Sequence, residues 1–218
     1  TGGKTKGLDV MKVFESIGKY ADQGGKRNGS IACYLETWHP DIIYFLETKK
    51  LVGDDDKLCK DLFIAIMIHD IFMRYVKEDK EWYLFCPDQC PNLTNKFGED
   101  FEREYLKCVE KKLYKYKLPA RQLWLLILDI NGESGTPYLL SKDTINRKSN
   151  YDHIGVVNIS NLCSEIVQYS SPEEHAVCNL CSLILPTFVV NKKFDFQKLI
   201  EVTKMMIINL NNIIDINF

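Results

Sequence analysis

The chain of 218 residues lacks the features that would mark a membrane or nucleic-acid protein. It has no apolar run long enough to cross a bilayer, and its first seven residues contain no apolar signal region. Its formal net charge is -2, and basic residues are scattered among acidic ones, which provides no basic patch for a polyanion. We therefore expect a cytoplasmic protein that binds neither a nucleic acid polymer nor a membrane.

The positions of the histidines and cysteines in the sequence also form no metal-ligand cluster and no disulfide framework. The four histidines are far apart, and the eight cysteines lack the compact spacing of a secreted miniprotein, so most should be reduced thiols. Cys86 and Cys90, like Cys178 and Cys181, have spacings found in metal and redox sites. A structural zinc site needs four ligands, usually in two well-formed pairs. We expect no metal, with zinc at Cys178 as the alternative to a redox role there.

The residues that are present can build a core, because 45% are hydrophobic and 11% aromatic. Apolar periodicity and capping residues predict helices at 10–21, 42–46, 71–77, 100–111, 120–130 and 196–213, with Asp70 and Asp195 as caps and Gly132 as a stop. Apolar runs between turn residues predict strands at 30–36, 62–68, 82–85, 138–140, 156–159, 166–169 and 177–185. Leu125 and Leu128 are expected in the core. This order of elements predicts an α/β layer or barrel.

One short segment combines residue types suited to redox chemistry. Asn161, Cys163 and Glu165 occupy alternate positions, so an extended or looped backbone would aim all three the same way. Cys178 follows fifteen residues after Cys163. An amide can orient a substrate, a carboxylate can take a proton, and two thiols can exchange electrons. Local composition alone favours a plainer interpretation, which is a hydrogen-bonded turn with a buried thiol.

The same segment, together with Val177-Cys178-Asn179-Leu180, resembles the large catalytic subunit of class I ribonucleotide reductase. Further motifs that resemble this family, in its order, are Asp22-Gln23-Gly24-Gly25, Tyr34-Leu35-Glu36-Thr37-Trp38-His39, Asp70-Ile71-Phe72-Met73, Cys86-Pro87-Asp88-Gln89-Cys90-Pro91, Gly135-Thr136-Pro137-Tyr138, Asn146-Arg147-Lys148-Ser149-Asn150 and Asn211-Asn212-Ile213-Ile214-Asp215. The resemblance covers nearly the whole chain. It implies that residues 1–218 form a single segment of a ten-stranded α/β barrel, with a finger loop at 160–165.

The resemblance also assigns roles to individual residues. It implies that Cys163 becomes a thiyl radical that removes the 3′ hydrogen of a ribonucleoside diphosphate, in a site kept away from water. Glu165 would take the 3′-hydroxyl proton, and Asn161 and Ser160 would bind the substrate. Cys178 would be a redox-active cysteine whose disulfide partner lies before Thr1. Cys181 corresponds to a small core position and is expected to be buried, as are Cys33 and Cys108.

The beginning of the chain departs from the family pattern. Residues 1–12 resemble a remnant of the specificity loop, with Gly3, Lys6, Gly7 and Lys12 as its candidate residues, but they lack the family's proline. Lys12 stands where an arginine would contact the base, and lysine does not reproduce the planar arginine fork. Thr37 and His69, the latter at a position where proline is common in the family, also mark a divergent member.

For the whole protein the resemblance implies a ribonucleoside-diphosphate reductase for DNA precursor synthesis. Implied partners are a metal-containing small subunit that supplies the radical, a second large subunit, and thioredoxin or glutaredoxin as reductant. ATP and deoxynucleotides would act as allosteric effectors, and this chain would hold no cofactor of its own. The ATP cone and the C-terminal part are expected outside these residues, which alone should be inactive. The alternative is a noncatalytic paralogue that binds or regulates a true large subunit.

Overall fold

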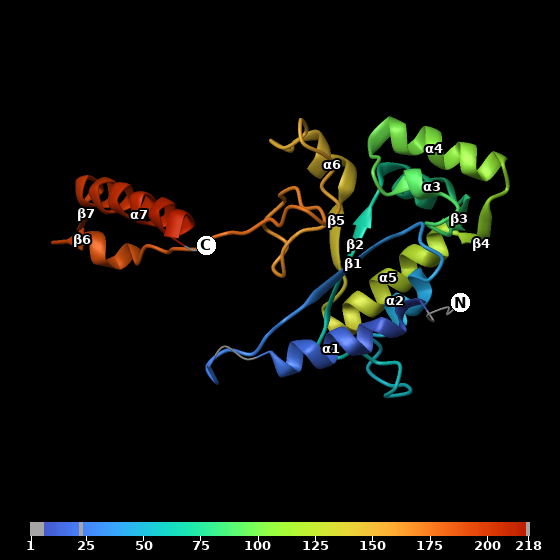
Figure 1. Cartoon of the computed structure of the whole chain (residues 1–218), viewed down its shortest axis with the longest axis horizontal. Helices are drawn as coiled ribbons and strands as arrows, with labels where there is room; N and C mark the ends of the chain where they lie inside the picture. The colour runs from blue at the N-terminus through green and yellow to red at the C-terminus, as the bar shows by residue number, and fades with distance from the viewer. Residues whose placement is uncertain (1–6, 22–23, 217–218) are drawn as a thin grey trace. The chain divides into compact units, whose positions relative to one another are not determined.

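The computed structural model describes residues 7–21 and 24–216, and these fall into two compact units, Thr1–Glu174 and His175–Phe218 (Figure 1). The first unit is built around a parallel sheet of β1 (Ala32–Glu36), β2 (Phe63–Ile68) and β5 (Tyr138–Ser141), in the order β1-β2-β5. β2 is central and buried on both faces, as its apolar sequence requires. A parallel sheet joined by helical crossovers confirms the α/β class and is consistent with part of an α/β barrel.

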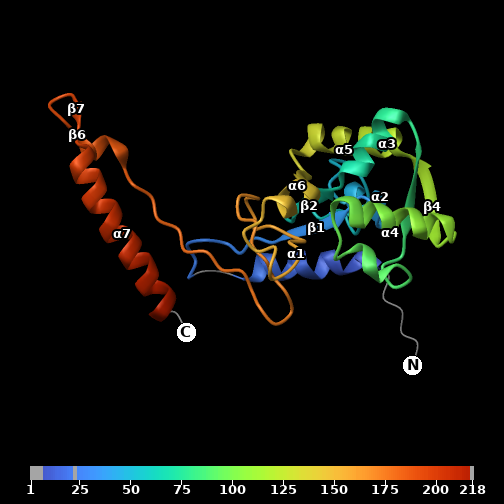
Figure 2. The same cartoon turned by 90° about the horizontal axis from the view of Figure 1, so that it is seen from above.

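Helices and a hairpin cover one face of this sheet (Figures 1 and 2). The helices of this unit are α1 (Met11–Tyr20), α2 (Ile42–Glu47), α3 (Asp70–Glu78), α4 (Gly98–Glu110), α5 (Ala120–Ser134) and α6 (Lys142–Arg147). The antiparallel hairpin consists of β3 (Glu81–Phe85) and β4 (Tyr114–Pro119), and single 3-10 turns lie at Gly7–Val10 and Pro91–Leu93. The main core on this side includes Ile64 and Ile66 of β2, packed against helices such as α2 and α5.

The opposite face of the sheet carries a smaller cluster. Ala65, Met67 and Leu140 form its buried centre, flanked by Tyr34 and Tyr138. These residues share a face because side chains alternate along a strand, and the register aligns Tyr34 with Ala65 and Ala65 with Tyr138. The candidate finger loop lies against this face, because Tyr34 is hydrogen-bonded to Asn161 and Ser164.

Several predicted helix boundaries need correction. α5 continues past Gly132 and ends at Ser134, and the following Gly135, with a positive φ of 72°, makes the left-handed C-cap that glycine accepts most readily. His69, and not Asp70, is the N-cap of α3. Leu125 and Leu128 are exposed, while Leu123 and Ile127 on the adjacent face of α5 are buried in the core. The prediction also missed β4 and α6.

Three predicted strands are wrong. Residues 156–159, 166–169 and 177–185 contain no strand, and among the residues described they pair with no other segment. A strand is defined by ladder hydrogen bonds to a neighbour, so apolar, β-branched sequence is not sufficient to make one. These segments keep the composition of strands without the pairing.

The second unit is a hairpin followed by a helix. After a 3-10 turn at Leu185–Phe188, β6 (Val189–Val190) and β7 (Lys193–Phe194) pair across Asn191 and Lys192, which both have positive φ. Two such residues are typical of the tight type I′ hairpin turn. Asp195 then caps α7 (Phe196–Ile216), as predicted, because its Oδ1 accepts the Lys198 N–H at 2.9 Å. Over the described part of the chain, no helix is long and apolar enough to cross a membrane.

Candidate active site

The loop at 160–165 is fixed to the open face of the sheet by Tyr34 of β1. The Tyr34 hydroxyl donates to the Asn161 carbonyl oxygen at 2.6 Å and lies 3.2 Å from Ser164 Oγ. Both partners lie more than 120 residues further along the chain. An edge strand of the parallel sheet therefore positions the segment that the sequence singled out.

Inside the loop, the backbone makes a tight turn from Asn161 to Ser164. The Ser164 N–H donates to the Asn161 carbonyl at 3.2 Å, and Ser164 adopts a left-handed φ of 65°. The Asn161 side chain closes the loop, because its Oδ1 accepts from the Ile166 N–H at 3.0 Å. Ser160 Oγ donates to the Ile166 carbonyl at 2.6 Å. The alternating alignment expected of an extended backbone is therefore absent, since the turn removes the period of two.

Cys163 occupies the third position of this turn and is exposed, as is Glu165. The structure thus has the hydrogen-bonded turn of the plainer interpretation without its buried thiol. Burial raises the pKa of the Tyr138 phenol, and an electrostatic interaction with Cys163 contributes to the same shift. Among the described residues, the Glu165 carboxylate has no hydrogen bond or ion pair. An accessible thiol and an unengaged carboxylate thus lie two residues apart on a braced loop.

The second unit contains the other two cysteines of interest. Cys178 is exposed there, so its thiol is accessible, and it belongs to a different unit from Cys163. Cys181 is also exposed, and the expectation that it is buried is wrong. The segment around it has no sheet neighbour among the described residues, and most of its side chains are exposed. Cys108 is buried as expected, and Cys33 is half-buried.

The candidate specificity loop is only partly described. Gly3 and Lys6 lie outside the described residues. Gly7 has a φ of 57°, and a Cβ there would lie 2.8 Å from the Asp41 carboxylate, so both conformation and space favour glycine. Lys12 is in α1, where its Nζ pairs with Glu15 Oε2 at 3.3 Å.

Sequence reasoning missed a buried charge cluster at the carboxyl ends of the three parallel strands. Glu36 ends β1, His69 follows β2, and Lys142 and Asp143 follow β5. Lys142 Nζ lies 2.6 Å from Glu36 Oε1, and the His69 ring lies between Glu36 Oε2 at 2.8 Å and Asp143 Oδ1 at 3.0 Å. The sequence could have indicated this cluster, because each of its residues ends or closely follows a predicted strand, and the ends of parallel strands meet at one edge of a sheet.

The cluster keeps both carboxylates ionised. Burial opposes the ionisation of Glu36, but the hydrogen bond from His69 and the charge of Lys142 hold its pKa below the ordinary value. Burial likewise opposes ionisation of Asp143, whereas hydrogen bonds from His69 and from the Gly98 and Asp70 amides lower its pKa to about 2. Phe101 stacks on the His69 ring with centroids 3.5 Å apart. The cluster ties the ends of all three strands together.

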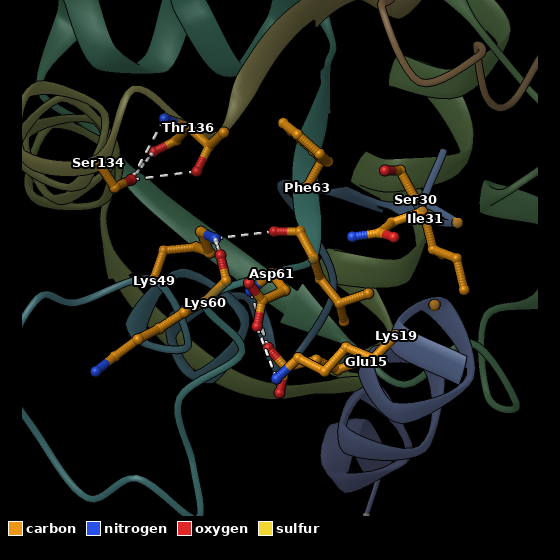
Figure 3. Close-up of a pocket in the computed structure, with 14 residues that line it drawn as sticks. Glu15, Lys19, Ser30, Ile31, Lys49, Lys60, Asp61, Phe63, Ser134 and Thr136 are labelled. Atoms are coloured by element: carbon orange, nitrogen blue, oxygen red, sulfur yellow. Dashed lines mark hydrogen bonds and ion pairs between the residues drawn. The ribbon is translucent and has the colours of Figure 1, made fainter. Parts of the chain in front are cut away.

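A polar cavity of about 450 Å³ lies at the opposite, amino-terminal ends of the strands (Figure 3). Its charged groups are already engaged within the protein. Lys49 Nζ donates to the carbonyls of Lys60 and Leu62, each at 2.8 Å, and Lys19 pairs with Asp61 at 2.7 Å, as the close-up shows. These contacts hold the segment that leads into β2 and leave the charged groups of the cavity paired. The finger loop, with an exposed thiol and a carboxylate that no described residue engages, is therefore the stronger candidate for an active site.

Comparison with known proteins identifies the family of the chain. The family model for the ribonucleotide reductase barrel domain matches residues 1–218. Ribonucleoside-diphosphate reductase large subunits from Acanthamoeba polyphaga mimivirus, Monkeypox virus and Danio rerio are 48%, 47% and 47% identical to the chain. Each alignment covers 100% of the chain and 25%, 28% and 28% of the respective relative. The chain therefore spans about a quarter of the length of the curated relatives it matches.

Proposed function

The chain belongs to the ribonucleotide reductase barrel-domain family, and we propose that it supplies the catalytic finger loop of a ribonucleoside-diphosphate reductase large subunit. The observation that carries the proposal is the state of this loop. Its backbone is braced by Tyr34 and by the Asn161 side chain, while the Cys163 thiol and the Glu165 carboxylate are exposed. A reactive thiol and a base need this combination of a fixed backbone and accessible functional atoms.

In the proposed reaction the Cys163 thiyl radical takes the 3′ hydrogen atom of the ribose and becomes a thiol, leaving a radical on C3′. Glu165 accepts the proton of the 3′-hydroxyl group. Asn161 Oδ1 is engaged with the Ile166 N–H, so its Nδ2 group is the part available to a sugar hydroxyl. Ser160 contributes through the loop, because its hydroxyl is committed to the Ile166 carbonyl.

Cys178 has the proposed role of reductant. One thiol of a pair protonates the hydroxyl on C2′, which leaves as water, and a hydrogen from the second thiol takes its place on C2′. The pair thereby gives up two electrons and two protons and becomes a disulfide. Cys163 then returns its hydrogen atom to C3′ and regenerates its radical, and Glu165 returns the proton to the 3′ oxygen. The exposed Cys178 thiol supplies one half of the pair, and we propose that the other half lies before Thr1.

The same proposal includes the partners of the whole protein. A metal-containing small subunit would generate the radical, a second large subunit would complete the dimer, and ATP and deoxynucleotides would act as effectors. Thioredoxin or glutaredoxin would reduce the Cys178 disulfide, which places the protein in the cytoplasm, where these reductants keep thiols reduced. We also propose that both units of residues 1–218 belong to one barrel domain.

The test is Cys163→Ser in the full-length large subunit, assayed with its small subunit for deoxynucleotide formation from a ribonucleoside diphosphate. We expect turnover to fall below detection, because serine cannot hold the radical under these conditions. Cys181→Ser is the matched control, since this cysteine is also exposed and has no assigned role. Turnover by Cys163→Ser comparable to the wild type would remove Cys163 from the radical site.

One observation favours a second candidate, a noncatalytic paralogue that binds or regulates a true large subunit. Lys12 stands where the family has a base-contacting arginine, and its amine is paired with the buried Glu15. A wild-type full-length protein that forms a complex with an active large subunit but shows no turnover with any small subunit would support this candidate over the reductase.

A further inference from the structure

We propose that Tyr34 is a positioning residue for Cys163, because its hydroxyl holds both ends of the turn that carries the thiol. The inference rests on the proposed function, since it concerns how that thiol is aimed at its substrate. The Tyr34 hydroxyl is hydrogen-bonded to Asn161 and Ser164, the first and fourth residues of the turn, and its effect on Cys163 is transmitted through them.

The hydrogen-bond directions around Tyr34 are fixed by chemistry. A phenol has one proton, and the Asn161 carbonyl can only accept, so that proton lies on the 2.6 Å bond to Asn161. The Ser164 hydroxyl, 3.2 Å away, must then be the donor to the phenol oxygen. The Asn161 carbonyl also accepts the Ser164 N–H, so both of its lone pairs are used. Tyr34 is thus integrated into the turn and does not merely lie against it.

The turn needs such support because Ser164 has a left-handed φ of 65°, a conformation that L side chains rarely adopt. Local hydrogen bonds within residues 160–166 do not attach the loop to the rest of the fold. Tyr34 does, because it comes from β1, which is paired to β2 along its whole length. Its aligned neighbour is Ala65, which is buried in the same cluster as Tyr34.

Phenylalanine at position 34 would keep the ring and its packing and remove only the two contacts to the loop. We expect Tyr34→Phe in the holoenzyme to lower kcat by about 10- to 100-fold with KM changed less than threefold, because small displacements of a reacting atom have effects of this size. Hydrogen abstraction should then limit turnover, so the isotope effect from 3′-deuterated substrate on kcat should rise.

Two further variants separate positioning from stability. Ser164→Ala removes one of the two contacts, so it should give a smaller loss of kcat, and the double variant should lose little more than Tyr34→Phe alone. Tyr105→Phe is the matched control, because its buried hydroxyl also makes two hydrogen bonds, to the N–H and carbonyl of Tyr83, away from the loop. It should lower thermal stability and leave the isotope effect unchanged.

Amide hydrogen exchange provides a readout that does not depend on turnover. In Tyr34→Phe, the Ser164 and Ile166 amides should exchange at least tenfold faster, while the β1 amides stay protected and show that the sheet is intact. Unchanged exchange at these two amides, or an unchanged isotope effect in an active enzyme, would overturn the role of Tyr34. Wild-type holoenzyme without turnover would instead refute the proposed function, and the exchange experiment would still decide whether Tyr34 fixes the turn.

Discussion

Lys142→Met is the most direct test of the buried charge cluster at the strand ends. Lys142 is fully buried, and its Nζ lies 2.6 Å from Glu36 Oε1 and 2.5 Å from the Thr94 carbonyl. Methionine has a similar length and volume, so the substitution removes the positive charge and its hydrogen bonds without leaving a large cavity. The buried Glu36 carboxylate loses its cation and keeps its contacts with Trp38 and His69.

The size of the effect follows from these contacts. Breaking a buried ion pair by removing one partner costs about 3–5 kcal/mol, because the remaining charge stays buried without compensation. The bonds from Trp38 and His69 still stabilise Glu36, so we expect the lower end, a loss of about 3 kcal/mol in the free energy of unfolding. Glu36→Gln alone should also destabilise, but in the Lys142→Met background it should cost about 2 kcal/mol less than it does in the wild type.

Urea unfolding followed by tryptophan fluorescence measures these values, since Trp38 and Trp82 are both buried in the same unit. The pH dependence provides a second check. Lys142 helps to hold the pKa of Glu36 below its ordinary value, so this stabilisation is present above the unfolded pKa of about 4.3 and is lost as the pH falls through the folded pKa. The gap between wild type and Lys142→Met should therefore narrow in acid. A cost below about 1 kcal/mol at pH 7, or additive single variants, would refute the reasoning.

Two further predictions concern the same region. The pKa of Asp143 is about 2 in the fold against an ordinary value of 3.8. Its ionised carboxylate therefore contributes about 2 kcal/mol to the free energy of unfolding above pH 4, and this contribution is lost as the pH falls from about 4 to 2. Urea unfolding midpoints between pH 2 and 7 measure the loss, and an Asp143→Asn variant whose stability falls as steeply in acid as that of the wild type would contradict it. The Thr37 hydroxyl is buried without a hydrogen-bond partner among the described residues. Thr37→Val should therefore raise the free energy of unfolding by about 1 kcal/mol, measured by thermal or urea unfolding. A loss of stability in this variant would show that the hydroxyl has a partner.

Much of the local structure could be predicted because it depends on neighbours in the chain. The apolar spacing of α1 and the Asp195 cap of α7 lie within a few residues of the elements they define. The buried run of β2 was equally clear, since its six consecutive residues are all apolar and three of them are isoleucine. The end of α5 was misplaced by three residues, because Gly132 and Gly135 both fit a helix stop and only the backbone conformation selects between them.

The candidate site was predictable in its residues and not in its geometry. Asn161, Cys163 and Glu165 lie in one short segment, so the family resemblance identified them without knowledge of the fold. The turn that brings the Asn161 side chain onto the Ile166 amide could not be read from alternation, since a two-residue period describes strands alone. The contact between Tyr34 and Asn161 joins residues 127 positions apart, and no local pattern contains it.

The sequence by itself determined the family, the α/β class and the chemical groups of the finger loop, because these depend on residue types and on their order. Only the tertiary structure decided which extended segments became strands, since a strand exists through its neighbour's hydrogen bonds. It also decided that Glu36, His69, Lys142 and Asp143 meet in one buried cluster, because parallel pairing brings three strand ends to a single edge.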